Sequence, residues 1–448
     1  MTAPPSHAGA ANTSGSSTGS APRFPPASLA VTVWGVAAFF YLAAFYLRNS
    51  PAVMTTELMR DFSITAVQLG NLSAFYFYAY LLMQIPTGVL VDSWGARRLL
   101  IAGSLLAAVG CVVFGTTGNF GLAATGRAIT GGATAVGWVV TLKVATHWFP
   151  SRRFATLSGI GLMIGNLGAL VAAVPLRLLV EQFGWRSVVV ASGAVMIGIG
   201  VLAWAVIRDD PSAKGYESHA PAALRSTSHI PLSRLLAGFK DIFRYRNTWL
   251  IFLAQGGIVG GILSFAGLWG VPFLKLRFGM PVTTAAAVCS VMVVCFAVGS
   301  PVSGYLSDRI GARKPIYLAG ILTVTIGWAA LFFLPGLPLP VFVAVGAVTA
   351  FASGANVLAF AYAKESVPSK FLGTISGAIN VGNMLGPTLL QPGIGWMLDH
   401  QWGGQTLDGV RVYTTGNYQT AFLLVVGWCV LSSVLVSLTR DTHNRQTA

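Results

Sequence analysis

Long apolar stretches separated by short polar ones run along most of this chain. Each has roughly 20 residues, the length that an α-helix needs to cross a hydrocarbon core. Because lipid cannot hydrogen-bond an exposed backbone, such segments are expected to be helical. The stretches lie near residues 29–47, 67–90, 99–117, 121–146, 155–180, 187–207, 247–274, 282–306, 315–335, 339–363, 372–397 and 418–439. The pattern therefore predicts twelve transmembrane helices.

Two pairs of matching segments indicate that the chain contains a duplicated half. Residues 88–98 read GVLVDSWGARR, and residues 304–314, an offset of 216, read GYLSDRIGARK. A second pair, 150–168 and 368–386, shares Pro, Ser, Thr and Gly positions at an offset of 218. Matches in the same order with a small shift predict two pseudo-symmetric bundles of six helices each.

Composition assigns the bundles to a membrane. Hydrophobic residues make up 54% of the chain and charged residues 9%, against about 25% charged in a soluble domain. We therefore expect an all-α polytopic membrane protein. The four cysteines all fall within apolar spans, so we expect neither a disulfide framework nor a metal site, and no cofactor.

The basic residues predict the orientation. With both termini in the cytosol, 19 Lys and Arg lie on the cytosolic side, and six lie outside: Arg60, Arg177, Arg186, Lys275, Arg277 and Arg411. This bias follows the positive-inside rule. Basic loops facing anionic headgroups account for the net charge of +15, so nucleic acid is not the expected partner.

These observations predict a domain organisation. We expect a disordered cytosolic tail at 1–27, helical bundles at 28–207 and 247–440, a cytosolic linker at 208–246 and a short tail at 441–448. The first residues lack the charged and apolar regions of a signal peptide. The expected location is a bacterial inner (plasma) membrane, with the protein functional as a monomer in the lipid bilayer.

The duplicated loop and the twelve spans resemble the major facilitator superfamily over about residues 29–440. Its GxLxDxxGxRR motif corresponds to Gly88, Asp92, Gly95, Arg97 and Arg98, with a second copy at Gly304, Asp308, Gly311 and Arg313. The resemblance implies a transporter that works by alternating access, in which these residues clamp the cytosolic side in one state. The alternative is an ordinary positive-inside loop with no switching role.

A finer resemblance points to one branch of the family. The stretches YLRNSPAVM (46–54), FYAYLLMQIPTG (77–88) and WFPSRR (148–153) are similar to the branch of anion:cation symporters and organophosphate antiporters. In that branch an Arg in the first helix contacts the substrate anion, and Arg48 matches its position. Organophosphate exchangers carry a second Arg where the 216-residue offset gives Ser264. A monocarboxylate or a zwitterion is therefore favoured over a doubly charged phosphate.

Two arginines in the spans each have two interpretations. Arg48 follows an apolar run of about 19 residues, so it either snorkels to the outer interface or faces the cavity with Tyr41 and Phe45 on the same helical face. Arg127 shares a stripe with Trp138 in the span 121–146. An Arg within a span normally faces the protein interior or water, and here it either binds substrate or holds helices together.

Neutral polar residues complete the predicted binding site. Their spacing puts them on shared faces of the spans 67–90, 247–274 and 372–397. They are Tyr76, Tyr80 and Gln84, then Gln255, Ser264 and Trp269, and finally Asn380 and Asn383. Each can orient a carboxylate or hydroxyl between the halves. The alternative for each is an ordinary interhelical hydrogen bond.

The placement of acidic residues limits the mechanism. All 13 lie in loops, in tails or at span ends, so the core offers fixed cations and no evident proton carrier. We expect facilitated transport or exchange of a small organic anion, a monocarboxylate or sugar acid. Proton or sodium coupling is left to Glu57, Asp61, Glu365 or a protonated substrate. The alternative is an amino acid or small peptide.

Other classes are less favoured. Gly165 and Asn166 stand where drug:proton antiporters show Gly-Pro, which argues against a drug exporter. A receptor would predict an additional soluble domain. An enzyme would need a convergent cluster of Asp, His or Ser in the core, and none is visible, so we expect a transporter and not an enzyme.

Overall fold

The computed structural model describes residues 23–220, 240–368, 371–443 and 445. Most of the predicted tail at 1–27, linker residues 221–239 and most of the C-terminal tail after residue 443 lie outside the described residues. The described chain is helical apart from loops and one short antiparallel hairpin, in which Thr406 lies opposite Arg411.

The first bundle contains six helical passes. In chain order its elements are α1 (Ala27–Asn49), η1 (Ser50–Val53), α2 (Thr55–Phe62), α3 (Ala66–Trp94), α4 (Ala96–Thr116), α5 (Phe120–Thr134), α6 (Val136–Trp148), η2 (Ser151–Arg153), α7 (Phe154–Val171), α8 (Val174–Phe183), α9 (Trp185–Val206) and η3 (Pro211–Lys214). Several passes are broken into two elements. Helix α3 bends by 58° at Pro86, because proline cannot donate the intrahelical hydrogen bond at that position.

The second bundle repeats this arrangement. Its elements are α12 (Arg246–Ser264), the π-helical turn η4 (Phe265–Trp269), α13 (Gly270–Phe278), α14 (Val282–Ile310), α15 (Lys314–Phe333), α16 (Leu339–Ser353), η5 (Gly354–Asn356), α17 (Val357–Glu365), α18 (Leu372–His400), β1 (Thr406–Leu407), β2 (Val410–Arg411) and α19 (Thr415–Ser437). Helix α9 ends and α12 begins close to the predicted limits of the linker.

The predicted fold class is confirmed. Within the described residues, ten helical spans are long and apolar enough to cross a membrane, and the bent α3 makes eleven. The remaining pass is α18, which has 29 residues. It carries several Asn, Gln and Pro residues, which lower its hydropathy.

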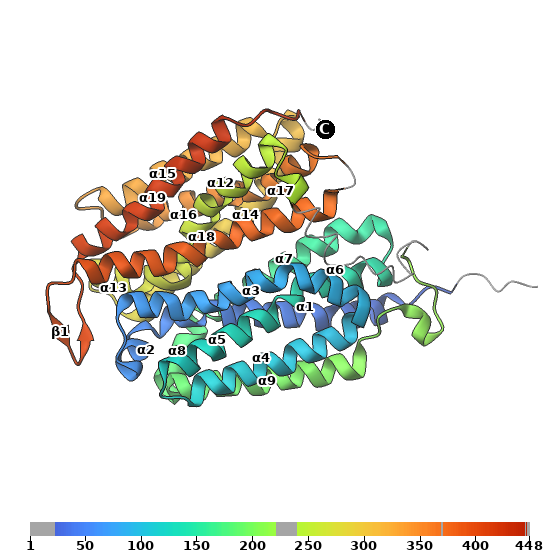
Figure 1. Cartoon of the computed structure of the whole chain (residues 1–448), viewed down its shortest axis with the longest axis horizontal. Helices are drawn as coiled ribbons and strands as arrows, with labels where there is room; N and C mark the ends of the chain where they lie inside the picture. The colour runs from blue at the N-terminus through green and yellow to red at the C-terminus, as the bar shows by residue number, and fades with distance from the viewer. Residues whose placement is uncertain (1–22, 221–239, 369–370, 444, 446–448) are drawn as a thin grey trace, which may run out of the picture.

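The two bundles lie side by side and contact each other mainly through α3 with α18 and α14 with α7 and α8 (Figure 1). We call the end with α2 and the β1–β2 hairpin the hairpin end, and the opposite end, where residues 208–220 lie, the linker end. At the hairpin end the backbones touch closely. A Cβ added to Gly70 of α3 would lie 2.5 Å from the carbonyl oxygen of Gln391 in α18.

Fewer polar contacts between described residues join the bundles toward the linker end. The hydrogen bond nearest to it that joins the bundles runs from Asn380 Nδ2 to Gln84 Oε1, at 2.9 Å. Between described residues, no hydrogen bond or ion pair crosses from one bundle to the other on the linker side of this pair. The contacts described between the bundles are therefore concentrated toward the hairpin end.

Linker residues 208–220 pack onto the first bundle. His147 Nδ1 lies 2.8 Å from Asp210 Oδ2, and His219 N donates to the carbonyl of His147 at 3.0 Å. Burial alone would raise the pKa of Asp210, but hydrogen bonds from His147 and Ser212 hold this pKa at about 2. The carboxylate is therefore charged at all ordinary pH values, which fixes this part of the linker to α6.

Helix packing within a bundle predicts a contrast between two glycines of α7. A Cβ at Gly168 would collide with the carbonyl oxygen of Leu42 in α1, whereas a Cβ at Gly159 would meet nothing within 4 Å. We expect Gly168→Ala to destabilise the purified protein by about 1–3 kcal/mol. Gly159→Ala should change stability by less than about 0.5 kcal/mol. Thermal unfolding in detergent measures both, and equal effects would contradict this packing.

Candidate functional site

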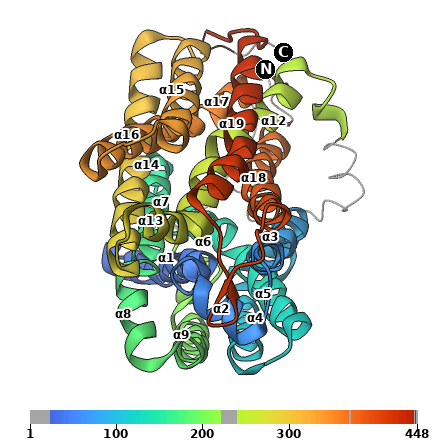
Figure 2. The same cartoon turned by 90° about the vertical axis from the view of Figure 1, so that its left-hand side faces the viewer.

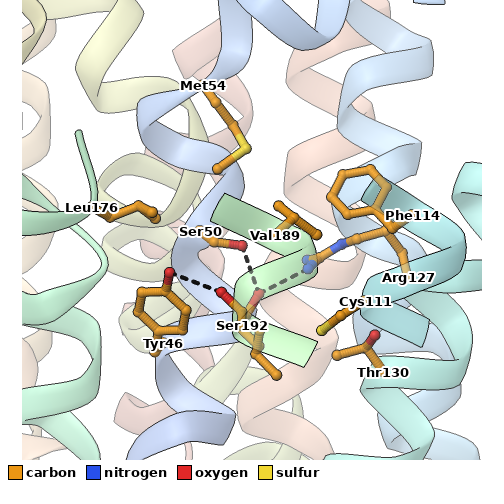
Figure 3. Close-up of a pocket in the computed structure, with 11 residues that line it drawn as sticks. Tyr46, Ser50, Met54, Cys111, Phe114, Arg127, Thr130, Leu176, Val189 and Ser192 are labelled. Carbon is orange, nitrogen blue, oxygen red and sulfur yellow. Dashed lines mark hydrogen bonds between the residues drawn. The ribbon is translucent and has the colours of Figure 1, made fainter. Parts of the chain in front are cut away.

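The site is built around a break in α1. Pro51 has no N–H to donate to the carbonyl of Leu47, four residues earlier, so this carbonyl loses its helical partner. Two side chains replace it: Ser50 Oγ donates to the oxygen at 3.0 Å, and Arg127 Nη1 donates at 2.8 Å. Dashed lines in Figure 3 join both side chains to this carbonyl. Arg127 thus ties α5 to the end of α1.

Arg127 is held by the protein itself. It is 2% exposed, its Nη2 reaches the carbonyl of Arg48 at 3.4 Å, and its guanidinium lies 5.2 Å from the centre of the Tyr76 ring. Its Nε has no partner. Beside it lies a cavity of about 10 Å³ (Figure 3), enough for about one water. These contacts favour a role for Arg127 in holding helices together.

Arg48 is the opposite case. It is 6% exposed and lies 3.7 Å over the ring of Phe45, an attractive cation–π arrangement. No acceptor atom of any described residue hydrogen-bonds its guanidinium, and no described carboxylate pairs with it; Nε is fully buried and unpaired. A buried charge normally has a partner. Arg48 is therefore a buried guanidinium that has an aromatic neighbour and no counter-ion among the described residues.

Aromatic side chains form the wall next to Arg48. Tyr41 packs against Phe45 and Trp138, with ring centres 4.8 and 5.2 Å away. Tyr76 stacks on Tyr80 at 6.2 Å. The Tyr76 hydroxyl lies 2.6 Å from Thr134 Oγ1 and donates to the carbonyl of Ala44 at 3.2 Å. These two bonds hold the Tyr76 ring in place.

The second bundle supplies the facing surface. Met384 of α18 packs with Tyr76, Phe77, Tyr80 and Ala135, so one apolar cluster joins the bundles. On the same helix, Asn380 bonds Gln84 as described above. Among the polar atoms of this bundle that are buried without a hydrogen-bond partner are Asn383 Oδ1, Gln391 Oε1 and Ser264 Oγ. Gln391 is a residue that the sequence analysis did not select.

Two predicted site residues are not brought to this interface. Gln255 donates to the carbonyl of Asn356 at 3.2 Å and accepts from Tyr317 at 3.0 Å, and it has no exposed surface. Trp269 is 1% exposed and donates to the carbonyl of Gln391 at 3.0 Å. Both side chains bond within the second bundle. The described residues contain no group of three or more His, Cys, Asp or Glu side chains suited to a metal ion.

The first copy of the repeated loop is bonded within the first bundle. Asp92 pairs with Lys143 at 2.9 Å. Arg97 donates from its side chain to the carbonyl of Trp204, at 2.6 Å from Nη2, and its backbone N donates to Asp209 Oδ1 at 2.7 Å. Asp209 therefore caps the start of α4. Among the described residues, Asp92 and Arg97 make no hydrogen bond or ion pair with the second bundle, and the predicted clamp of the cytosolic side in one state stays a prediction.

The second copy has a related arrangement. Arg313 pairs with Asp308 at 2.6 Å and with Glu365 at 2.9 Å, while its backbone N donates to Asp441 Oδ1 at 3.3 Å. Burial alone would lower the pKa of Arg313, but its bonds with Glu365 and Asp308 raise this pKa above the usual value. Asp209 and Asp441 were not predicted as helix caps. An Arg-Asp pair follows the last helix of each half, and this repeat was the available signal.

Comparison with a family model and with known proteins identifies the family of this chain. The model described as Major Facilitator Superfamily matches residues 33–275 and 258–448. "Probable hexose phosphate transport protein" of Chlamydia pneumoniae is 23% identical, over 66% of this chain and 70% of the relative. "Probable galactarate/D-glucarate transporter GudP" of Escherichia coli is 22% identical, over 90% and 91%. Each relative is a distant one.

Solved structures show the same fold. A crystal structure of a bacterial homologue of the human lysosomal transporter Spinster, in an inward-facing and unoccupied conformation, superimposes with a TM-score of 0.73. The two sequences are 18% identical, and the match covers 92% of this chain and 97% of the other.

Mutations can test whether Arg127 stabilises the protein through its hydrogen bond to the carbonyl of Leu47. We expect Arg127→Met to destabilise the protein by about 1–3 kcal/mol, because the carbonyl loses its strongest donor. Pro51→Ala restores a backbone N–H at the position that would bond Leu47. In a double-mutant cycle, Arg127→Met should therefore cost less in the Pro51→Ala background, as measured by thermal unfolding. Strictly additive effects would show that the carbonyl is not what Arg127 stabilises.

Proposed function

Because the chain belongs to the Major Facilitator Superfamily, we propose that it carries a small organic anion across the membrane by alternating access. Family membership and the apolar helices make it an integral, multi-pass membrane protein. The family and the names of its relatives indicate a transporter. The proposed substrate lies between the two bundles, against Arg48.

The observation that carries the proposal is the buried guanidinium of Arg48 with no counter-ion among the described residues. Arg127 is occupied by backbone carbonyls. Ser264, at the position related to Arg48 by the repeat, brings no charge. One available cation is best matched by a substrate with one negative charge, a monocarboxylate.

Features of the second bundle favour a sugar acid among monocarboxylates. The buried, unpaired oxygens Asn383 Oδ1 and Gln391 Oε1 are acceptors that a hydroxyl group can satisfy. Hexose phosphate and glucarate, which are named in the two relatives above, are anions that carry hydroxyl groups. An aromatic wall beside the charge suits the apolar face of a sugar ring or carbon chain.

The transport cycle that we propose is a rocking of the bundles about this site. The linker end faces the cytosol, with both termini, and the hairpin end faces outside, as the basic residues predict. The conformation described here is then open toward the cytosol. No acidic side chain of the described residues pairs with Arg48, so the proposed mode is facilitated transport or exchange. The protein works as a monomer in a bacterial inner membrane.

Uptake into proteoliposomes tests this function. We expect a labelled monocarboxylate or sugar acid to accumulate, and Arg48→Ala to reduce its uptake by about 10–100-fold, because a charged hydrogen-bond partner is lost. Arg48→Lys should retain part of the activity. The control is Arg60→Ala, which removes an exposed Arg of α2, 58% exposed in its side chain, and should leave uptake unchanged.

The substrate panel should also contain amino acids, small peptides and cationic drugs. Uptake of a zwitterion, abolished by Arg48→Ala, would replace the sugar acid by the alternative class. Equal acid uptake by wild type and Arg48→Ala, with both proteins folded, would contradict the proposed site.

A further inference from the structure

One carboxylate at the hairpin end links the two bundles. Asp399, near the end of α18, accepts hydrogen bonds from two backbone amides of α3, Ala66 N at 3.2 Å and Val67 N at 2.8 Å. Its side chain is 13% exposed. A carboxylate at the start of a helix interacts favourably with the unpaired N–H groups and the positive end of the dipole. Here the carboxylate and the helix belong to opposite bundles.

The contact with Asp399 completes the hydrogen bonding of the N–H groups at the start of α3. Four N–H groups at the start of a helix lack an intrahelical acceptor. Thr65 and Gln68 satisfy two of them with a reciprocal capping box, Thr65 N to Gln68 Oε1 at 2.9 Å and Gln68 N to Thr65 Oγ1 at 3.5 Å. The other two are those of Ala66 and Val67. Helix α3 therefore completes its N-terminus only while α18 lies against it.

The hairpin holds the carboxylate in place. Tyr413 donates to Asp399 Oδ1 at 2.6 Å, and Arg411 Nη1 donates to the same oxygen at 3.1 Å. The Tyr413 hydroxyl also accepts from Ala66 N at 3.3 Å. The hairpin itself packs on α2 of the first bundle (Figure 2). Two segments of the second bundle thus converge on the beginning of α3.

The repeat does not provide a second copy of this arrangement. The 218-residue offset carries Asp399 onto Glu181, which pairs with Arg177 of its own bundle at 2.8 Å. The asymmetry indicates that Asp399 has a specific task at this end of the molecule.

We propose that Asp399 is the latch of the hairpin-end gate, a positioning residue that biases the transporter toward the conformation described here. Opening this end separates α18 from α3, which breaks both amide contacts and returns their polar groups to water. The inference rests on alternating access in the proposed function, but it does not depend on which substrate is carried.

Two cysteine reporters can follow the two ends separately. Cys289 is 3% exposed and lines a small cavity between the bundles with Asn49 and Ala52, so it should react from the hairpin side only when that end opens. At the linker side, Gly377→Cys places a thiol one turn from Asn380 on the same face of α18, where a Cβ meets nothing within 4 Å. Cys295, which is partly exposed, is replaced by Ala in the background.

Labelling of intact cells and inverted vesicles with a membrane-impermeant maleimide tests the latch. We expect Asp399→Asn to raise labelling of Cys289 from outside by about tenfold and to lower labelling of Gly377→Cys from the cytosolic side, because the population shifts. Tyr413→Phe should have a smaller effect in the same direction. No substrate is used, so the result stands independently of the uptake experiments.

Two controls make the outcome decisive. Asp408→Asn changes an exposed acid at the tip of the same hairpin and should label like wild type, and Cys289→Ala should abolish the outside signal. Unchanged labelling in Asp399→Asn would overturn the proposal. A rise at both reporters would overturn it as well, since it would mean general loosening of the fold.

Discussion

The site depends on one backbone carbonyl that the chain leaves without a helical donor. Pro51 removes the N–H that Leu47 needs, α1 breaks there, and Arg127 crosses from α5 to complete the hydrogen bond. Pro51 therefore sets where α1 ends and η1 begins. Arg48 lies directly at this end, over the ring of Phe45, and η1 packs against η4 of the second bundle.

The two buried arginines differ in what surrounds them. Arg127 has the carbonyls of Leu47 and Arg48, which at a helix C-terminus carry partial negative charge. Arg48 has an aromatic face and no acid or acceptor among the described residues. A low dielectric strengthens any interaction with an opposite charge. The first arginine therefore joins two helices through these carbonyls, whereas the second has no partner among the described residues.

Helix positions could be predicted well because the thickness of a bilayer sets them. The span predicted at 121–146 corresponds to α5 and α6, Phe120 to Trp148. The role of Arg48 in binding substrate stays a prediction that the family resemblance suggested. The contacts that complete the picture join residues far apart in the sequence. Asp399 bonds an amide 332 residues away, and Asp209 caps a helix 112 residues earlier. Periodicity carries no information about such pairs. For the same reason, nothing in their spacing distinguished the buried Gln255 and Trp269 from cavity residues.

The bend in α3 has a mechanical meaning. The hydroxyls of Tyr76 and Tyr80 belong to the segment before Pro86, whereas Asp92 of the repeated loop belongs to the segment after it, inclined by 58°. Nine residues of helix measure about 13 Å, so this short arm carries the loop well away from the axis of the longer segment. The hydrogen bond missing at Pro86 also couples the two segments less tightly than a continuous helix would. We therefore expect that a change in the angle of the repeated loop would leave the aromatic side chains of the longer segment in place.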